Sequence, residues 1–224
     1  MGRFIELTAA DGHRLAAYEA SPPGAPRGAL AVAPEIFGVN SHIRAVADGY
    51  AADGYLAIAP ALFDRVQPGF ESGYSPQDIE AGRALMQRVT MEQAMLDVTA
   101  AIEHMHAHHA GKVGIVGYCW GGTVAWVAAA RAPQLACAVP YYGGGMPQHM
   151  GERPRCPVLC HFGEKDEHPS PEQARALLAA HPEVQAFFYP AGHGFNCDQR
   201  GSYDAASSAL ARSRTLAFLA ERLG

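Results

Sequence analysis

Apolar runs and segments of helical period alternate along most of this chain. Six short apolar runs are predicted as buried strands, at residues 29–33, 55–59, 113–117, 137–142, 158–162 and 185–189. Segments predicted as helices lie at residues 41–53, 76–88, 91–109, 123–130, 171–180 and 203–223. Strands that alternate with helices are typical of an α/β fold. We therefore predict a mostly parallel central sheet flanked by helices.

Two segments do not follow this alternation. Residues 4–7 and 14–19 alternate polar and apolar positions around Asp11-Gly12, which predicts a hairpin. Residues 62–74 contain a proline and two glycines and have no clear period, so we predict a long loop that covers the substrate. The sequence contains no internal repeat, and its length suits one domain that buries about 70% of its unfolded surface. We predict a single α/β domain over residues 1–224.

The charge of the chain limits the classes of partner. The formal net charge is −5 and the basic residues are scattered, so neither nucleic acid nor an anionic membrane is an expected partner. The first residues alternate polar and apolar types, unlike a signal peptide, and no apolar run approaches the ~18 residues of a membrane span. We expect a cytoplasmic protein.

Cysteine and histidine spacings give little support for a disulfide or a metal. The chain has five cysteines, an odd number in a chain without a signal-peptide pattern, which argues against a disulfide framework. Cys156 and Cys160 bracket an apolar run predicted as a strand, which favours a structural role. His104 and His108 share a helix face, but a solvated helix end is favoured there because no third ligand type stands nearby. We predict no metal and no organic cofactor.

The chain is organised around residues 112–123, K-V-G-I-V-G-Y-C-W-G-G-T. The spacing Gly117-x-Cys119-x-Gly121 is the nucleophile-elbow pattern of α/β-hydrolases, with cysteine in place of serine. So sharp a strand-to-helix turn needs neighbours without bulky Cβ groups, and the following helix directs its N–H groups at the tip, which favours a thiolate. Cys119 is the candidate nucleophile. The alternative is a buried structural thiol, since cysteine is among the most buried residue types.

Loops that follow predicted strands carry the other candidate groups. The carboxyl ends of parallel strands form a common crevice, so Glu35, Cys119, Asp166 and His193 are positioned to meet there. The order nucleophile, acid, histidine is that of α/β-hydrolases. His193 has a glycine on each side, which leaves its ring free to reach Cys119; the alternative is an ordinary loop histidine.

Asp166 would hold the second ring nitrogen of His193 and so fix its tautomer and orientation. Asp166 is alternatively a turn carboxylate, and the neighbouring Glu164 and Glu167 are competing choices for the acid.

Five motifs together are more specific than the elbow alone: P-E-I-F-G-V-N at 34–40, G-Y-C-W-G-G at 117–122, Y-Y-G at 141–143, F-G-x-x-D at 162–166 and A-G-H-G-F at 191–195. With them the chain resembles the dienelactone hydrolase (carboxymethylenebutenolidase) family nearly from end to end. The resemblance implies an α/β-hydrolase fold and a Cys119-His193-Asp166 triad that hydrolyses a small lactone through an acyl thioester.

The resemblance also implies a role for Glu35 as a fourth catalytic partner. In similar family members the resting thiol points towards this glutamate and away from the triad, and substrate binding displaces the glutamate, which takes the thiol proton. A free thiol has a pKa of about 8.5, and a permanently exposed thiolate would be oxidised, so such a switch solves both problems. The alternative is a carboxylate that caps the helix at 41–53, although Asn40 and Ser41 already supply caps.

Two backbone N–H groups, of Ile36 and Trp120, would form the oxyanion hole. Phe37, Trp120 and Tyr142 are candidates for the apolar wall of the pocket, and each is alternatively a core residue.

Family substrates carry a carboxylate beside the lactone, and family members bind it with arginines. Arg83 lies near the position of one such arginine, with Arg65 as a competitor. Where a second arginine is expected this chain has Asn196-Cys197, and Arg200 is the candidate substitute. The alternative for each arginine is an exposed surface residue.

We therefore expect a monomer that opens a small unsaturated lactone such as dienelactone to a maleylacetate-type product. A general carboxylesterase or thioesterase with the same triad is the nearest alternative. Outside these classes, a redox-sensing thiol protein centred on Cys119 and a catalytically silent ligand-binding protein are the remaining hypotheses.

Overall fold

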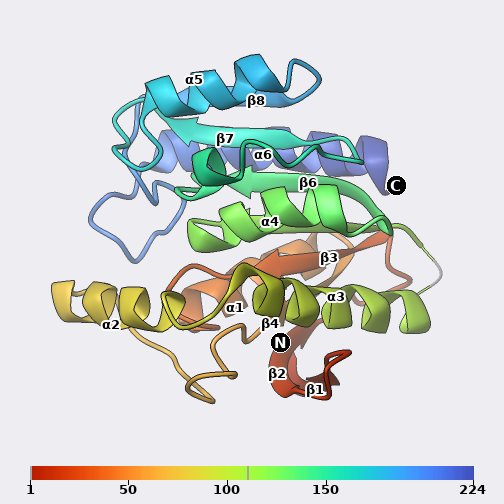
Figure 1. Ribbon diagram of the computed structural model, residues 1–224. Helices are drawn as coiled ribbons and strands as arrows, with labels where there is room; N and C mark the ends of the chain where they lie inside the picture. Colours follow the sequence, from red (N-terminus) through yellow and green to blue (C-terminus); the bar gives the residue numbers. More distant parts are fainter. Residues whose placement is uncertain (1, 110) are drawn as a thin grey trace.

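The computed structural model describes residues 2–109 and 111–224, and its centre is an eight-stranded sheet (Figure 1). The strands are β1 (Arg3–Thr8), β2 (Arg14–Ala20), β3 (Gly28–Ala33), β4 (Tyr55–Pro60), β5 (Val113–Tyr118), β6 (Leu135–Tyr141), β7 (Leu159–Gly163) and β8 (Gln185–Tyr189). Their order across the sheet is β1-β2-β4-β3-β5-β6-β7-β8. The β1–β2 hairpin and the β2–β4 pair are antiparallel, and the other pairs are parallel. The mostly parallel sheet is as predicted.

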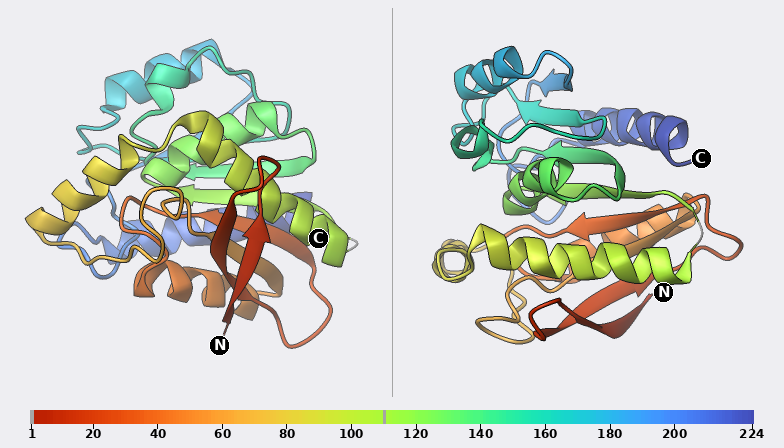
Figure 2. Two further views of the ribbon diagram at one scale, coloured as in Figure 1. Left: turned by 60° about the horizontal axis from the view of Figure 1, so that its bottom comes forward. Right: turned by 45° about the vertical axis from the view of Figure 1, so that its right-hand side comes forward.

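Helices cover both faces of the sheet. They are α1 (Ser41–Ala52), α2 (Pro76–Met86), α3 (Met91–His108), α4 (Trp120–Arg131), α5 (Pro171–Ala180) and α6 (Ala205–Arg222), with a short 3-10 helix η1 (Met146–His149). Helices α3, α4 and α5 lie on one face of the sheet, and α1 and α6 lie on the other (Figure 1). Their buried side chains form a separate apolar cluster on each face. Figure 2 shows the β1–β2 hairpin at one end of this layered structure and β8 at the other. Within residues 2–109 and 111–224, no helix has both the length and the apolar character needed to cross a membrane.

The buried strands follow from their composition. The strands β3, β4 and β5 are apolar runs with every residue buried, because helices cover them on both faces. The edge strand β1 instead alternates in exposure, as a half-solvated hairpin strand does. The parallel central strands end at the same edge of the sheet, and the loops that carry the candidate residues meet there.

Three sequence predictions need correction. Helix α4 begins at Trp120, directly after Cys119 and three residues before the predicted start, because the elbow turn is complete at the cysteine. The strand β4 includes Pro60, which pairs with Ala17 on a neighbouring strand. Residues 62–74 form a loop, but none of them is among the cavity-lining residues; helix α2 lies over the cavity instead, through Ile79, Arg83 and Met86.

The glycines of the elbow are required by close backbone contacts. A Cβ on Gly117 would lie 1.9 Å from the Gly121 carbonyl oxygen, and one on Gly121 would lie 2.1 Å from the Ala33 carbonyl oxygen. Any larger residue at either position would push β5, α4 and β3 apart. The sequence reasoning for these two glycines is therefore confirmed.

We expect Gly121→Ala to destabilise the protein by about 2–3 kcal/mol, because the new methyl group has no room beside the Ala33 backbone. In a protein of this size that loss lowers Tm by roughly 5–10 °C, measurable by calorimetry. Gly151→Ala is the matched control, since a Cβ there meets nothing within 4 Å. Equal Tm values for the two variants would contradict the proposed steric role.

Candidate active site

Cys119 lies at the tip of the turn between β5 and α4. Its backbone adopts φ 55° and ψ −117°, a left-handed conformation that costs energy in a residue with a side chain. The turn is held by the Cys119 N–H, which donates to the Tyr141 carbonyl at 3.1 Å, and by the Cys119 carbonyl, which accepts from Gly122 at 2.9 Å. The half-buried thiol is thus projected over the sheet edge at the N-terminus of α4, where unpaired helix N–H groups favour negative charge.

His193 and Asp166 complete a chain of contacts with the thiol. The Nε2 atom of His193 lies 3.1 Å from the Cys119 Sγ, and its Nδ1 atom lies 2.9 Å from Asp166 Oδ2. The other Asp166 oxygen accepts the backbone N–H of His168 at 2.8 Å, which fixes the carboxylate in its turn. Glu164 and Glu167 are exposed, so Asp166 is the carboxylate that contacts the ring.

The surroundings of His193 favour its protonated form. Burial by itself lowers the pKa of His193, but the adjacent Cys119 sulfur and the hydrogen bond to Asp166 outweigh it and raise this pKa. The site is therefore arranged to hold an imidazolium next to the thiol sulfur.

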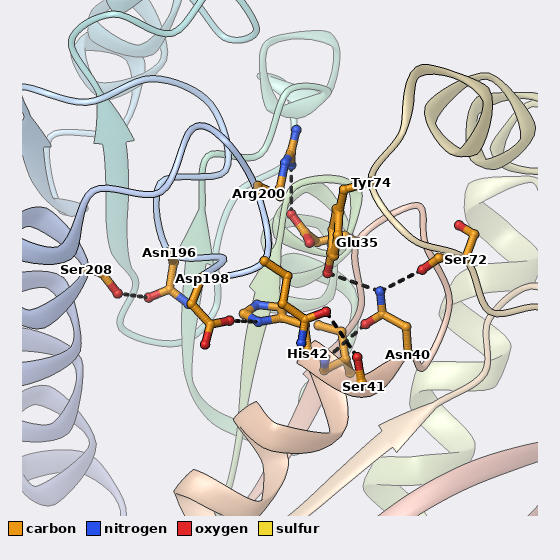
Figure 3. A network of polar contacts seen from close by, with 12 residues as sticks. Glu35, Asn40, Ser41, His42, Ser72, Tyr74, Asn196, Asp198, Arg200 and Ser208 are labelled. Atoms are coloured by element: carbon orange, nitrogen blue, oxygen red, sulfur yellow. Dashed lines mark hydrogen bonds and ion pairs between the residues drawn. The ribbon is translucent and has the colours of Figure 1, made fainter.

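Glu35 is engaged by Arg200 and not by the thiol. The Glu35 side chain is almost completely buried, and its Oε1 accepts from the Arg200 guanidinium at 3.1 Å (Figure 3). The Cys119 thiol rests against His193 in this structure, which differs from the resting orientation that the resemblance implied. The ion pair with Arg200 gives a physical reason, because it already neutralises the buried carboxylate.

A turn brings Arg200 to the site. The N–H of Arg200 donates to the Cys197 carbonyl at 3.1 Å, which folds the chain back after Asn196-Cys197. The guanidinium packs against Gly194, where a Cβ would lie 2.4 Å from it, and 5.5 Å from the centre of the Phe37 ring. Burial lowers the pKa of Arg200, but Glu35 together with the other groups around the guanidinium outweighs burial and raises this pKa, so Arg200 stays cationic.

A cavity of about 400 Å³ opens beside Cys119. Seven of the predicted site residues line it: Ile36, Phe37, Arg83, Cys119, Trp120, His193 and Arg200. A Cβ on Gly82 would lie 2.2 Å from the Ile36 carbonyl oxygen, so this glycine allows α2 to pack tightly on the loop after β3 and to bring Arg83 to the cavity. The cavity therefore combines a thiol, two arginines and apolar walls.

One predicted substrate-binding residue, Tyr142, and one competing candidate, Arg65, lie elsewhere. Tyr142 is fully buried and is not among the lining residues; its ring packs edge-on against His193, with 5.2 Å between ring centres. Tyr142 therefore packs against His193 and does not form the wall of the cavity. The guanidinium of Arg65 is held by Asp97 and Asp11, both at 2.7 Å, and so Arg65 is a structural ion-pair residue.

Some lining residues were missed by the sequence analysis: Ile79, Met86, Thr123, Gly144, Gly145, Gln148 and His168. The spacing of residues 79, 83 and 86 places them on one face of α2, a signal that the sequence contained. Gln148 lies in η1, which has no strong periodic pattern, and so nothing in the sequence placed it at the cavity.

Comparison with known proteins agrees with this architecture. The sequence model of the dienelactone hydrolase family matches residues 15–223. The chain belongs to the dienelactone hydrolase family. It is 37% identical over 228 residues to a carboxymethylenebutenolidase of Pseudomonas putida, covering 96% of this chain and 95% of the relative. Family membership confirms the resemblance and makes this protein a hydrolase that acts on ester bonds.

Solved structures support the same fold. A Klebsiella pneumoniae protein described as a dienelactone hydrolase is 31% identical, with a TM-score of 0.85 and 99% of each chain covered. An esterase from Pyrococcus furiosus, 13% identical, has a TM-score of 0.74 over 100% of this chain and 93% of its own, and this likeness concerns the fold alone. The predicted α/β-hydrolase fold is confirmed.

Proposed function

We propose that this dienelactone hydrolase family member opens a small unsaturated, carboxylate-bearing lactone of the dienelactone type, giving a maleylacetate-type product. The observation that carries the proposal is the contact chain from Cys119 Sγ through His193 to Asp166, beside a cavity lined by two arginines. We further propose that the protein acts as a cytoplasmic monomer without a cofactor. The Pseudomonas putida relative named carboxymethylenebutenolidase supports the choice of substrate class.

The proposed reaction has two half-steps. The Cys119 thiolate attacks the lactone carbonyl, the ring C–O bond breaks, and the protonated His193 delivers its proton to the leaving oxygen. Water then attacks the acyl thioester while His193 accepts one of its protons, and the thiolate leaves as the acid is released. Asp166 orients the ring and stabilises its charged form in both steps.

The oxyanion is proposed to be stabilised by the backbone N–H groups of Ile36 and Trp120. Both residues line the cavity beside Cys119, and Trp120 is the first residue of α4, so its N–H has no partner within the helix. Trp120 is held in place by stacking on Phe63, with 5.0 Å between ring centres.

Glu35 is proposed to act as an alternative partner for the thiol proton once substrate separates it from Arg200. One of its oxygens already accepts from Arg200. A substrate carboxylate that binds Arg200 would compete for that guanidinium and release the Glu35 side chain. Binding of the correct anionic substrate would then be coupled to activation of Cys119.

The substrate proposal is tested by comparing dienelactone with its neutral methyl ester. We expect kcat/KM to be higher for the carboxylate, because Arg83 and Arg200 line the cavity. Arg83→Gln should reduce kcat/KM for the carboxylate by about tenfold, a modest loss because Arg83 is exposed, and should leave the methyl ester little changed.

Arg88→Gln is the matched control, since Arg88 is an exposed arginine just beyond α2 and is not among the cavity-lining residues that the structure describes. Equal turnover of the two substrates, unaffected by Arg83→Gln, would overturn the anionic-lactone proposal and favour a general carboxylesterase or thioesterase that uses the same triad.

A further inference from the structure

Three buried side chains lie close together near the candidate active site, and only Glu35 among them has been given a role above. They are Glu35, His42 and Cys197, which are 1%, 4% and 0% exposed, and each offers one ligand atom within 4.8 Å of the other two. They come from the loop after β3, the start of α1 and the turn after His193. The three positions have no spacing that marks a metal motif, and so the sequence alone did not bring them together.

Two atoms of this group are buried and unsatisfied. Glu35 Oε2 and His42 Nε2 find no hydrogen-bond partner anywhere in residues 2–109 and 111–224. A buried polar atom left unpaired destabilises a folded protein, a charged group more than a neutral one, so such atoms call for an occupant. Here both belong to the same small group of potential ligands.

The other atoms of Glu35 and His42 are already held. Glu35 Oε1 accepts from Arg200, and His42 Nδ1 lies 3.2 Å from Asp198 Oδ1 (Figure 3). A carboxylate on one ring nitrogen leaves the other as a lone-pair donor, the arrangement that orients metal-binding histidines. The Asp198 side chain is 67% exposed, which places this second carboxylate between the buried group and solvent.

We propose that Glu35, His42 and Cys197 form a binding site for Zn²⁺, with Asp198 orienting His42. Carboxylate oxygen, imidazole nitrogen and thiolate sulfur are all zinc ligands, and the sulfur favours Zn²⁺ over Mg²⁺ or Ca²⁺. Ligand atoms around tetrahedral zinc lie about 3.3–3.8 Å apart. Side-chain rotations that move the ligand atoms by roughly 1 Å would therefore bring them to zinc-binding distance. The fourth position is left for water.

Charge and protons balance at this site. The Cys197 thiol releases its proton to solvent when zinc binds, because the thiolate is the form that ligates the metal. The ion then has two anionic ligands, and Asp198 offsets part of the charge that Arg200 adds.

Zinc at this site binds Glu35 Oε2, the oxygen that does not accept from Arg200. If Glu35 takes the thiol proton, as proposed above, zinc binding removes that acceptor and slows hydrolysis. This consequence rests on the proposed function, whereas binding of the ion does not. The site would therefore make the hydrolase sensitive to free Zn²⁺.

The binding test uses Co²⁺ as a spectroscopic probe and the full chain carrying Cys119→Ala, which removes the competing thiol. We expect one Co²⁺ per chain, a sulfur-to-cobalt charge-transfer band, and displacement by Zn²⁺. Adding Cys197→Ser should abolish the band, and adding Asp198→Asn should weaken binding by about tenfold through the orientation of His42. Cys156→Ser, at a half-buried cysteine outside the group, is the matched control and should change nothing.

A charge-transfer band that survives Cys197→Ser would overturn the site. The absence of any band in the Cys119→Ala protein would overturn it too, and would leave a water molecule as the partner of Glu35 and His42. Because Asp198 is exposed, Asp198→Asn keeps the test decisive should Cys197→Ser fold poorly.

In the enzyme with Cys119 present, Zn²⁺ should slow ester hydrolysis, and Cys197→Ser should raise the Zn²⁺ concentration needed for this inhibition at least about tenfold. Absence of ester hydrolysis would refute the proposed function while the Co²⁺ result still decides on the metal site.

Discussion

Replacing Cys119 with alanine should reduce lactone hydrolysis by about 10⁴-fold or more, to a level near the background rate. The Cys119 sulfur is the atom that His193 contacts, at 3.1 Å, and Cys119 lines the cavity. Removing this sulfur eliminates the proposed acyl thioester and not merely a binding contact. The fall should appear in kcat, whereas binding of the intact substrate remains measurable by calorimetry. Loss of dienelactone absorbance is the direct assay.

Cys156→Ala is the matched control, because this cysteine is half-buried and is not among the cavity-lining residues that the structure describes. Its kcat should equal that of the unmodified protein. Mass spectrometry after rapid quenching should detect an acyl adduct on Cys119 and on no other cysteine.

The alternatives give different results. Hydrolysis that survives Cys119→Ala would refute the nucleophile. A protein without hydrolytic activity, whose Cys119 is reversibly oxidised by peroxide, would instead be a redox-sensing thiol protein. The chain of contacts from Cys119 through His193 to Asp166 argues against that reading, since oxidation of a thiol needs no such proton-transfer chain.

The sequence predicted well the strands and the loops that carry the candidate site, because both depend on local patterns. Buried strands are unbroken apolar runs, and the elbow glycines are fixed by contacts of about 2 Å that exclude any side chain. The rule that loops after parallel strands share one edge then brought together Cys119, Asp166 and His193 from three distant segments. These predictions required no knowledge of side-chain packing.

The sequence predicted side-chain direction poorly, since direction depends on neighbours distant in the chain. Like the other candidate residues, Tyr142 directly follows a strand, in its case β6. Its ring nevertheless packs against His193 and Phe195. Arg65 lies in the loop expected to cover the substrate but is held by Asp97, which comes from α3. In both cases a tertiary contact decides the direction, and no local pattern contains that information.

The same reasoning applies to Arg200 and to Cys197, one of the proposed zinc ligands. Arg200 reaches the cavity because the chain turns back at residues 197–200, and that turn also buries Cys197 close to His42. The resemblance led us to expect a second arginine at Asn196-Cys197. In this chain the cation that reaches the cavity is Arg200, a few residues further along, and Cys197 places a thiol in the space beside Glu35.

The second large effect is expected for Asp166→Asn, which should lower kcat by about 10³-fold. The asparagine amide donates to His193 Nδ1 where the carboxylate accepted, so the ring takes the tautomer that cannot receive a proton from the thiol. The fall should be smaller than the ~10⁴-fold seen with serine triads, because a thiol needs less activation than a hydroxyl. Single-turnover kinetics with dienelactone would measure the acylation step directly.

The pH profile separates this role from a merely structural one. The Asp166 carboxylate raises the pKa of His193, so a neutral amide lowers that pKa and the imidazolium loses its proton at lower pH. The basic limb of the kcat/KM profile should therefore move to lower pH in Asp166→Asn. Glu167→Gln, at the exposed neighbouring carboxylate, should leave both kcat and the profile unchanged. A lower kcat with an unmoved basic limb would mean that Asp166 holds the turn around His168 without tuning the histidine.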